Sequence, residues 1–118
     1  GRSPYDWKRV DEDVINVPVF KTLRAHYMYG YKIIICSGRD EICRSQTEKW
    51  LERNDIRYDA LYMRPAGDMR KDAVVKEEFW REIIQSYHII AMVDDRHQVI
   101  DHARKLGFTV LDCAGNTF

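Results

Sequence analysis

Two adjacent aspartates, Asp94 and Asp95, directly follow a short apolar segment and precede an amphipathic one. Neighbouring carboxylates repel each other, so the pair needs a cation opposite it, unless Asp95 merely caps a following helix. Carboxylates bind Mg2+, and a bound metal can bridge to phosphate oxygens. The pair is therefore a candidate metal site, with a helix cap as the alternative.

Other apolar segments are also followed by residues suited to phosphate chemistry. One segment ends at Ser37, Gly38 and Arg39, and the loop and helix start after another carry Arg64, Asp68, Arg70 and Lys71. A hydroxyl group can hydrogen-bond a phosphate oxygen, and Lys and Arg neutralise phosphate charge, Arg in a bidentate manner. These residue types predict a site for a phosphate group beside a divalent cation. Each also has an ordinary explanation, since SGR is a common turn, Lys71 could be a surface lysine and Asp68 could shape a turn.

The apolar pattern predicts helices and strands in alternation. Helices are expected from Asn16, as N-cap, to Gly30, then at about 41–54 and 72–86, with a fourth that Gly107 closes. Strands are expected at 31–39, 60–64, 88–93 and 108–112. The core-facing residues of the last three helices are expected to be Ile42, Trp50 and Leu51, then Val74, Val75, Phe79 and Ile83, then Val99, Ile100, Ala103 and Leu106.

This alternation predicts an α/β fold with a mostly parallel sheet and helices on both faces. In such sheets the ligand lies beyond the carboxyl ends of the strands. The loops after Cys36 and Val93 are therefore expected at the same edge of the sheet, and the residues suited to phosphate chemistry with them.

Size and composition narrow the function further. The 118 residues correspond to one domain, and 19 Lys and Arg balance 19 Asp and Glu. This neutrality argues against coating of nucleic acid and restricts any such contact to a local one. Three cysteines without a CxxC motif argue against a zinc site or a disulfide framework and favour a reducing cytosol. No apolar run approaches membrane-spanning length, so no membrane partner is expected.

The strings SGR, DD and a lysine at the start of a helix resemble the second, fourth and third motifs of the haloacid dehalogenase superfamily. The longer strings GRSPYDW, ICSGRDE, PAGDMRKDAVVKEEFW and VDDRHQVI resemble the phosphatase domains of bacteriophage polynucleotide kinase/3′-phosphatases and of similar bacterial proteins. The resemblance covers nearly the whole chain and implies a Rossmann-like sheet. The superfamily's first motif, DxDGT, does not occur in these residues. The chain is therefore expected to be a single domain, residues 1–118, that is incomplete at its N-terminus and lacks its central strand.

The resemblance implies a phosphomonoesterase that requires Mg2+. An aspartate upstream of Gly1 would attack phosphorus and form an aspartyl-phosphate, which water hydrolyses, while a second upstream aspartate acts as general acid and base. Asp94 and Asp95 would hold the metal, and Lys71, Arg39 and Asp68 would take part in catalysis, with Asp68 orienting Lys71 or Arg39. The residues that would contact the substrate phosphate are Arg2, Ser37, Gly38, Arg39 and Lys71.

The implied substrates are 3′-phosphorylated DNA or RNA ends or nucleoside 3′-monophosphates. The resemblance also implies a fused kinase domain and a location in the cytoplasm of a bacterial or phage-infected cell. The short connections leave little room for a large cap, which suits a polymer end that enters from outside. Two alternatives stay open. One is a small-molecule or nucleotide phosphatase of the same superfamily, and the other is a non-catalytic domain that binds phosphate or a nucleic-acid end.

Overall fold

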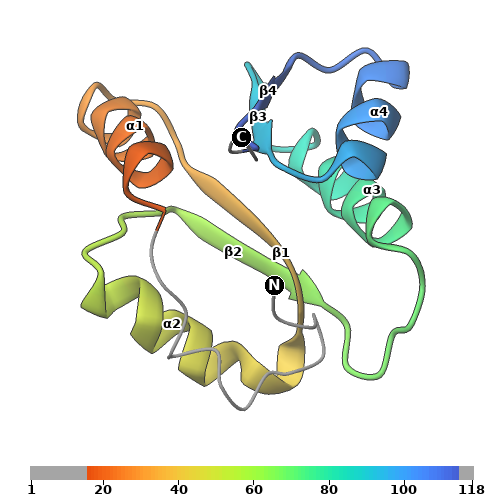
Figure 1. Cartoon of the computed structure of the whole chain (residues 1–118), viewed down its shortest axis with the longest axis horizontal. Helices are drawn as coiled ribbons and strands as arrows, with labels where there is room; N and C mark the ends of the chain where they lie inside the picture. The colour runs from red at the N-terminus through yellow and green to blue at the C-terminus, as the bar shows by residue number, and fades with distance from the viewer. Residues whose placement is uncertain (1–15, 115–118) are drawn as a thin grey trace, which may run out of the picture. The chain divides into compact units, whose positions relative to one another are not determined.

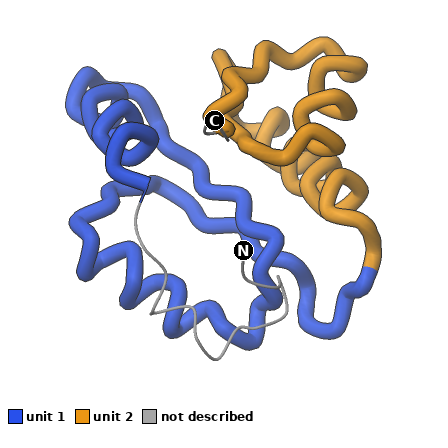
Figure 2. The backbone as a smooth tube through the Cα atoms, viewed as in Figure 1, with its two compact units in different colours: residues 1–69 blue, residues 70–118 orange. Residues whose placement is uncertain are grey.

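A computed structural model describes residues 16–114 of the chain. Its elements are, in order, α1 (Val17–Met28), β1 (Ile34–Asp40), the 3-10 helix η2 (Glu41–Cys43), α2 (Arg44–Arg53), β2 (Ala60–Arg64), α3 (Asp72–Ile83), β3 (Met92–Asp94), α4 (His97–Lys105) and β4 (Val110–Asp112), as Figure 1 shows. The chain divides into two compact units, residues 1–69 and 70–118 (Figure 2), and each is described by itself. None of the helices in the described ranges is long and apolar enough to cross a membrane.

The first unit contains a parallel pair of strands joined by a helical crossover. β1 and β2 pair in parallel, with Ile34 opposite Ala60 and Ser37 opposite Met63. Leu51 from α2 and Ile56 from the following turn are buried with Met63 of β2. Burial of these apolar side chains holds α2 against the strand pair.

The first helix has the boundaries that its capping residues predict. The Asn16 side chain accepts a hydrogen bond from the Val19 N–H, and Pro18 lies in the first turn. Gly30 adopts φ +104°, a left-handed conformation that glycine reaches at little cost. Phe20 contacts Trp50 of α2 edge to face, at 6.0 Å between ring centroids, so α1 packs on α2.

The second unit repeats the pattern on a smaller scale. β3 and β4 pair in parallel, with Met92 opposite Val110, and α4 connects them. The helices α3 and α4 pack together (Figure 1), and their buried residues include Val75, Phe79, Val99 and Ile100. The α/β class with parallel strands is thus confirmed. In residues 16–114 no strand pairing links β1 to β3, and a further strand between them stays a prediction.

Several element details differ from the sequence expectation. Ile42 is 64% exposed because it lies in η2, outside the regular turn of α2 that buries Leu51. Val74 and Leu106 are also exposed, since the buried stripe of α3 follows the four-residue spacing from Val75 and Leu106 is the C-cap of α4. The strand expected at 88–93 begins only at Met92, because its partner strand is three residues long.

Candidate active site

The SGR motif forms an irregularity at the end of β1. Ser37 pairs with Met63 and Asp40 with the next residue of β2, so Gly38 and Arg39 are extra residues on the β1 side. Bulges of this kind redirect a strand end and are frequent beside active sites. The Ser37 Oγ accepts a hydrogen bond from the Arg39 N–H at 3.1 Å, and its hydroxyl hydrogen can still be donated to a phosphate oxygen.

Asp40 was not a candidate from the sequence, but its buried carboxylate holds two loops together. One oxygen accepts from the Ile42 N–H at 2.8 Å and caps η2, and the other accepts from the Gly67 N–H at 2.9 Å. The second bond ties the loop after β2 to the end of β1. An aspartate at the end of a predicted strand, immediately before a helix, is the signal that could have identified this cap.

Arg64 complements this clamp from the other strand. It is only 3% exposed, and its guanidinium donates to the Gly38 carbonyl at 2.9 Å and to the Asp68 carbonyl at 3.1 Å. Arg64 is therefore held in the loops near the SGR motif and is not a freely exposed charge, and its expected contribution of positive charge to a phosphate stays a prediction. Because its donors satisfy two backbone carbonyls, Arg64 sets the shape of the loops that carry Arg39 and Asp68.

The second unit places a lysine directly against one of the paired aspartates. The Lys76 amine donates to Asp94 Oδ2 at 3.0 Å and lies 3.4 Å from Asp72 Oδ2. All three side chains are only 10–15% exposed, so these charges are shielded from water. Arg96 Nη1 approaches Asp72 at 3.3 Å from the start of α4. Lys76 is thus the cation opposite Asp94.

The two aspartates have different surroundings. Asp94 Oδ1 accepts from the backbone N–H groups of Asp95 and Arg96, at 2.8 and 3.0 Å, so both of its oxygens are engaged. The Asp95 side chain is exposed and accepts no hydrogen bond from residues 16–114. The N-cap of α4 is Arg96, which makes the helix-cap alternative for Asp95 wrong.

These two carboxylates suit a loosely held magnesium ion. Among the described residues there is no group of three or more acidic, histidine or cysteine side chains arranged for a metal. Mg2+ keeps several water ligands and is commonly held by one or two carboxylates together with substrate phosphate. Asp95 has the open oxygens of a direct ligand, and Asp94 is arranged to position it. The donor set therefore fits Mg2+ without forming a complete cage.

Lys71, the lysine that the sequence favoured, has a different environment. It is exposed and occupies the N-cap position of α3 without a side-chain capping bond. Lys76 lies one turn after Asp72, and this i, i+4 spacing of opposite charges was the signal that could have identified it. Whether Lys71 contacts substrate stays a prediction.

A thiol lies near the same aspartates. The Cys113 N–H donates to the Asp94 carbonyl oxygen at 3.0 Å. Burial raises the pKa of the Cys113 thiol, and the charges of Asp95 and Asp94 act in the same direction. Cys113 is therefore protonated at neutral pH and is not a candidate nucleophile.

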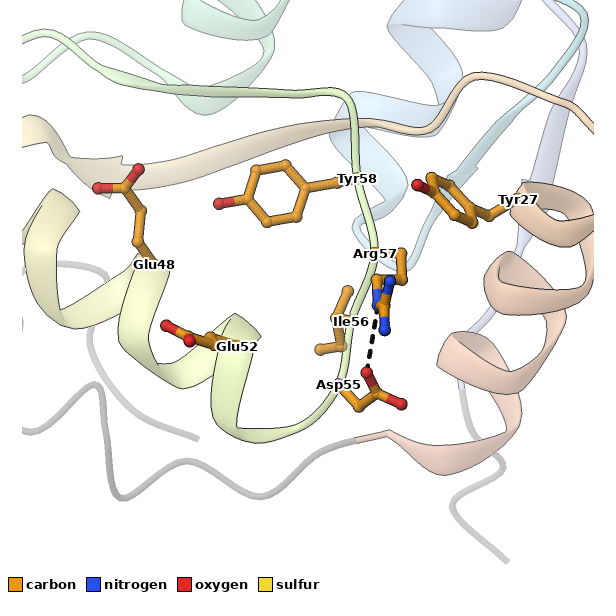
Figure 3. A pocket seen from close by; sticks show the side chains of 7 residues that line it. All are labelled: Tyr27, Glu48, Glu52, Asp55, Ile56, Arg57 and Tyr58. Atoms are coloured by element: carbon orange, nitrogen blue, oxygen red, sulfur yellow. Dashed lines mark hydrogen bonds and ion pairs between the residues drawn. The ribbon is translucent and has the colours of Figure 1, made fainter.

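A hollow of about 560 Å³ in the first unit is lined by none of these residues (Figure 3). It is lined by Tyr27, Glu48, Glu52, Asp55, Ile56, Arg57 and Tyr58. Arg57 is already paired with Asp55 at 3.2 Å, and burial, followed by the charge of Glu48, raises the pKa of Tyr58. This acidic lining would repel a phosphate group, so the hollow is not the expected site.

The predicted site residues thus fall into both units. Ser37, Gly38, Arg39 and Asp68 belong to residues 1–69, where the contacts of Asp40 and Arg64 organise their loops, whereas Lys71, Asp94 and Asp95 belong to residues 70–118. Arg2 lies outside the described residues. The meeting of the two sets at one edge and the orienting role of Asp68 stay predictions.

Comparison with known proteins gives a consistent assignment. The family described as the polynucleotide kinase PNKP phosphatase domain matches residues 1–118. A protein of Autographa californica nuclear polyhedrosis virus, assigned as a bifunctional polynucleotide kinase/RNA ligase, is 34% identical over 106 residues. That alignment covers 85% of this chain and 15% of the viral protein.

Solved structures give the same result. Two structures of a Pnkp1/Rnl/Hen1 complex, one titled an RNA repair complex, match all of this chain at 38% identity with a TM-score of 0.91. The chain covers 39% and 41% of the matched chains, so it spans less than half the length of these relatives. The chain belongs to the family of polynucleotide kinase phosphatase domains, which are of the haloacid dehalogenase type.

Proposed function

We propose that this domain removes 3′-phosphates from polynucleotide ends in a reaction that requires Mg2+ and passes through an aspartyl-phosphate. The contact between Lys76 and Asp94, beside the exposed Asp95, carries the proposal. It places a cation and two carboxylates at one strand end in a member of a phosphatase family. The proposed nucleophile is the aspartate of a DxDGT motif, which these 118 residues do not contain.

Each part of the site has a separate task in this reaction. Asp95, with Asp94 beside it, would hold Mg2+, which would supply charge neutralisation at the phosphate. Lys76 fixes the Asp94 carboxylate and adds positive charge where charge develops on the phosphate oxygens. Ser37 and Arg39 bind the phosphate from the bulge at the end of β1. Arg2 and Lys71 add substrate contacts. Asp40 and Arg64 keep the bulge in the conformation that presents Ser37.

The proposal is tested with matched substrates in the intact protein that carries this chain. Oligonucleotides with a 3′-phosphate or a 5′-phosphate, and a nucleoside 3′-monophosphate, are compared at the same Mg2+ concentration. We expect release of phosphate from the 3′ ends and from the mononucleotide, with little release from 5′ ends. Equal rates at the two ends would refute the substrate assignment. Hydrolysis of the mononucleotide alone would favour a small-molecule phosphatase, and no hydrolysis would favour a binding domain.

Two lysine variants separate the candidate roles. Lys76→Met should lower phosphate release by orders of magnitude, because it removes the cation beside Asp94. Lys71→Met leaves that contact in place, so it should affect the reaction only through substrate binding. A large loss of kcat with Lys71→Met and a small one with Lys76→Met would reverse this assignment.

The relatives suggest a setting for the activity. The viral relative is assigned as a kinase/ligase, and the matched structures include an RNA repair complex. We propose that this domain acts beside a kinase or ligase domain on RNA ends in the cytoplasm. A bacterial or phage-infected cell remains the proposed host. DNA and RNA oligonucleotides of one sequence, each with a 3′-phosphate, would reveal the preferred nucleic acid.

A further inference from the structure

An aromatic surface lies at the end of the first unit opposite the SGR motif. Tyr29 and Tyr31 stack at 6.3 Å between ring centroids with 21° between their planes, and His26 lies 5.7 Å from Tyr31. Together with Ala25 these three residues line a hollow of about 290 Å³. Tyr29 is 85% exposed although Tyr31 lies beside its ring, so most of the Tyr29 side chain is open to solvent. His26, Tyr29 and Tyr31 are called the aromatic platform below.

The backbone around Gly30 builds this platform. The Gly30 N–H donates to the Tyr27 carbonyl and the Tyr31 N–H to the His26 carbonyl, the hydrogen bonds of a Schellman helix end. The positive φ of Gly30 reverses the chain, so that Tyr31 returns to His26. His26 Nδ1 donates to the Thr22 carbonyl at 2.8 Å, which fixes the ring and leaves Nε2 without a partner among the described residues. The platform is therefore held in place before any ligand binds.

The stretch of sequence that contains the platform carries charged side chains of one sign only. Residues 16–39 contain four Lys and Arg and no Asp or Glu. At the average frequency of the whole chain, which has 19 Asp and Glu in 118 residues, a stretch of 24 residues would contain about four. Arg24 is neutralised by Asp55 at 2.5 Å. Lys21 has no ion pair with the described residues, whereas Lys32 forms a long ion pair with Asp59 at 3.9 Å and is 65% exposed. Lys21, and Lys32 through its exposed side, can thus contact an anionic ligand.

We propose that the aromatic platform stacks on unpaired bases of a single-stranded nucleic acid, whose phosphates contact Lys21 and Lys32. Single-strand sites combine a positive surface that follows the phosphates with aromatic rings that stack on bases of any sequence. A protein partner would use the same aromatic side chains, but only a partner with an acidic surface would also use the lysines of this stretch. The charge pattern therefore favours nucleic acid.

The platform also implies a length for the ligand. The platform precedes β1, and Ser37 and Arg39 belong to the second half of this strand. The seven residues of β1 (Figure 1) span about 20 Å at roughly 3.3 Å per residue. A stacked strand rises about 3.4 Å per nucleotide, so about six nucleotides bridge the two ends. This length estimate, unlike the binding proposal itself, rests on the proposed 3′-phosphatase function. Under that function an oligonucleotide of eight or more nucleotides reaches both the platform and the phosphate site, whereas a mononucleotide does not.

Binding is tested without turnover, using single-stranded 12-mers that carry no terminal phosphate, in the intact protein. Tyr29→Ala with Tyr31→Ala should weaken binding measured by fluorescence anisotropy about 5- to 150-fold for each stacked base. Tyr29→Phe with Tyr31→Phe should retain it, because phenylalanine keeps the stacking face. Tyr87→Ala, which removes an exposed tyrosine of the second unit, is the control and should leave affinity unchanged.

Photocrosslinking locates the contact independently of other nucleic-acid sites in the intact protein. A 12-mer with 5-iodouracil should crosslink to Tyr29 or Tyr31, as read by mass spectrometry of the peptides. Unchanged affinity in the double alanine variant, with crosslinks only elsewhere, would overturn the proposal and leave a protein partner as the occupant. If the phosphatase assay shows no hydrolysis but the crosslink forms, the nucleic-acid contact of the platform is supported and only the proposed reaction is refuted. Equal loss of hydrolysis for the 12-mer and the mononucleotide would instead show a structural role for the tyrosines.

Discussion

Replacing Lys76 with methionine removes one charge from the shielded network of the second unit and keeps most of the side-chain volume. Two carboxylates then lose their cation, since the amine lies 3.0 Å from Asp94 Oδ2 and 3.4 Å from Asp72 Oδ2. With an effective dielectric constant of about 20, each contact corresponds to an attraction of about 5 kcal/mol. Desolvation of the amine offsets part of it, and breaking such a pair typically costs about 3–5 kcal/mol. We expect a loss of about 4 kcal/mol for the second unit.

The assay must report the stability of the second unit inside the intact protein. Native-state hydrogen exchange with peptide resolution does so, because it measures the opening free energy of each segment separately. The amides of α3 and α4 should exchange much faster in Lys76→Met, and those of β1 and β2 should change little. Lys71→Met removes an exposed lysine five residues earlier and serves as the matched control, with an expected change below about 0.5 kcal/mol.

A double-mutant cycle tests the contact itself. Once Asp94→Asn has removed the charge on the partner, Lys76→Met should cost less, and the difference measures the coupling between the two side chains. We expect a coupling of about 1–3 kcal/mol. If Lys76→Met is as mild as Lys71→Met, or if the two changes are simply additive, the amine does not bind Asp94 and the charge network is wrong.

Three further outcomes follow from other contacts. Asp95→Asn should reduce phosphatase activity at least about 100-fold with little loss of stability, measured by phosphate release and thermal unfolding, because it removes the proposed metal ligand, whose side chain is exposed. Arg64→Met should destabilise the first unit by about 2–4 kcal/mol in denaturant unfolding, because the carbonyls of Gly38 and Asp68 lose their donor. The hydrogen bonds from Arg81, then from His102, lower the pKa of Glu77 below its ordinary value of 4.5. The contribution of Glu77 to the stability of the protein is therefore present above pH 4.5, and it is lost as the pH falls through the lower pKa of the folded state. Acid unfolding curves of Glu77→Gln should lack this loss.

Each of these outcomes has a result that contradicts it. Near-normal turnover by Asp95→Asn would exclude it as a metal ligand, and an unfolded variant would show a structural role instead. Arg64→Met with wild-type stability would mean that the two carbonyls find other donors. An acid unfolding curve unchanged by Glu77→Gln would show that another carboxylate governs the low-pH range.

Local sequence signals determined most of the elements of this protein. Asn16 caps α1 and Gly30 ends it, and the run ALYMR forms β2 with the predicted bounds. These features depend on neighbours a few residues away, such as a side chain that accepts from an N–H three positions later. The strings SGR and DD likewise placed the candidate residues at the ends of β1 and β3.

Tertiary structure decided which charged residues meet. Both Lys71 and Lys76 belong to the start of α3, but only the phase of that helix against β3 determines which amine reaches Asp94. In the same way Arg64 became a buried clamp because β2 pairs with the bulged end of β1, a contact between residues 26 positions apart. The sequence shows which charged residues are present and how they are spaced. Packing of the helices and strands determines which of them meet when they are distant along the chain, and burial then determines the strength of each charge contact.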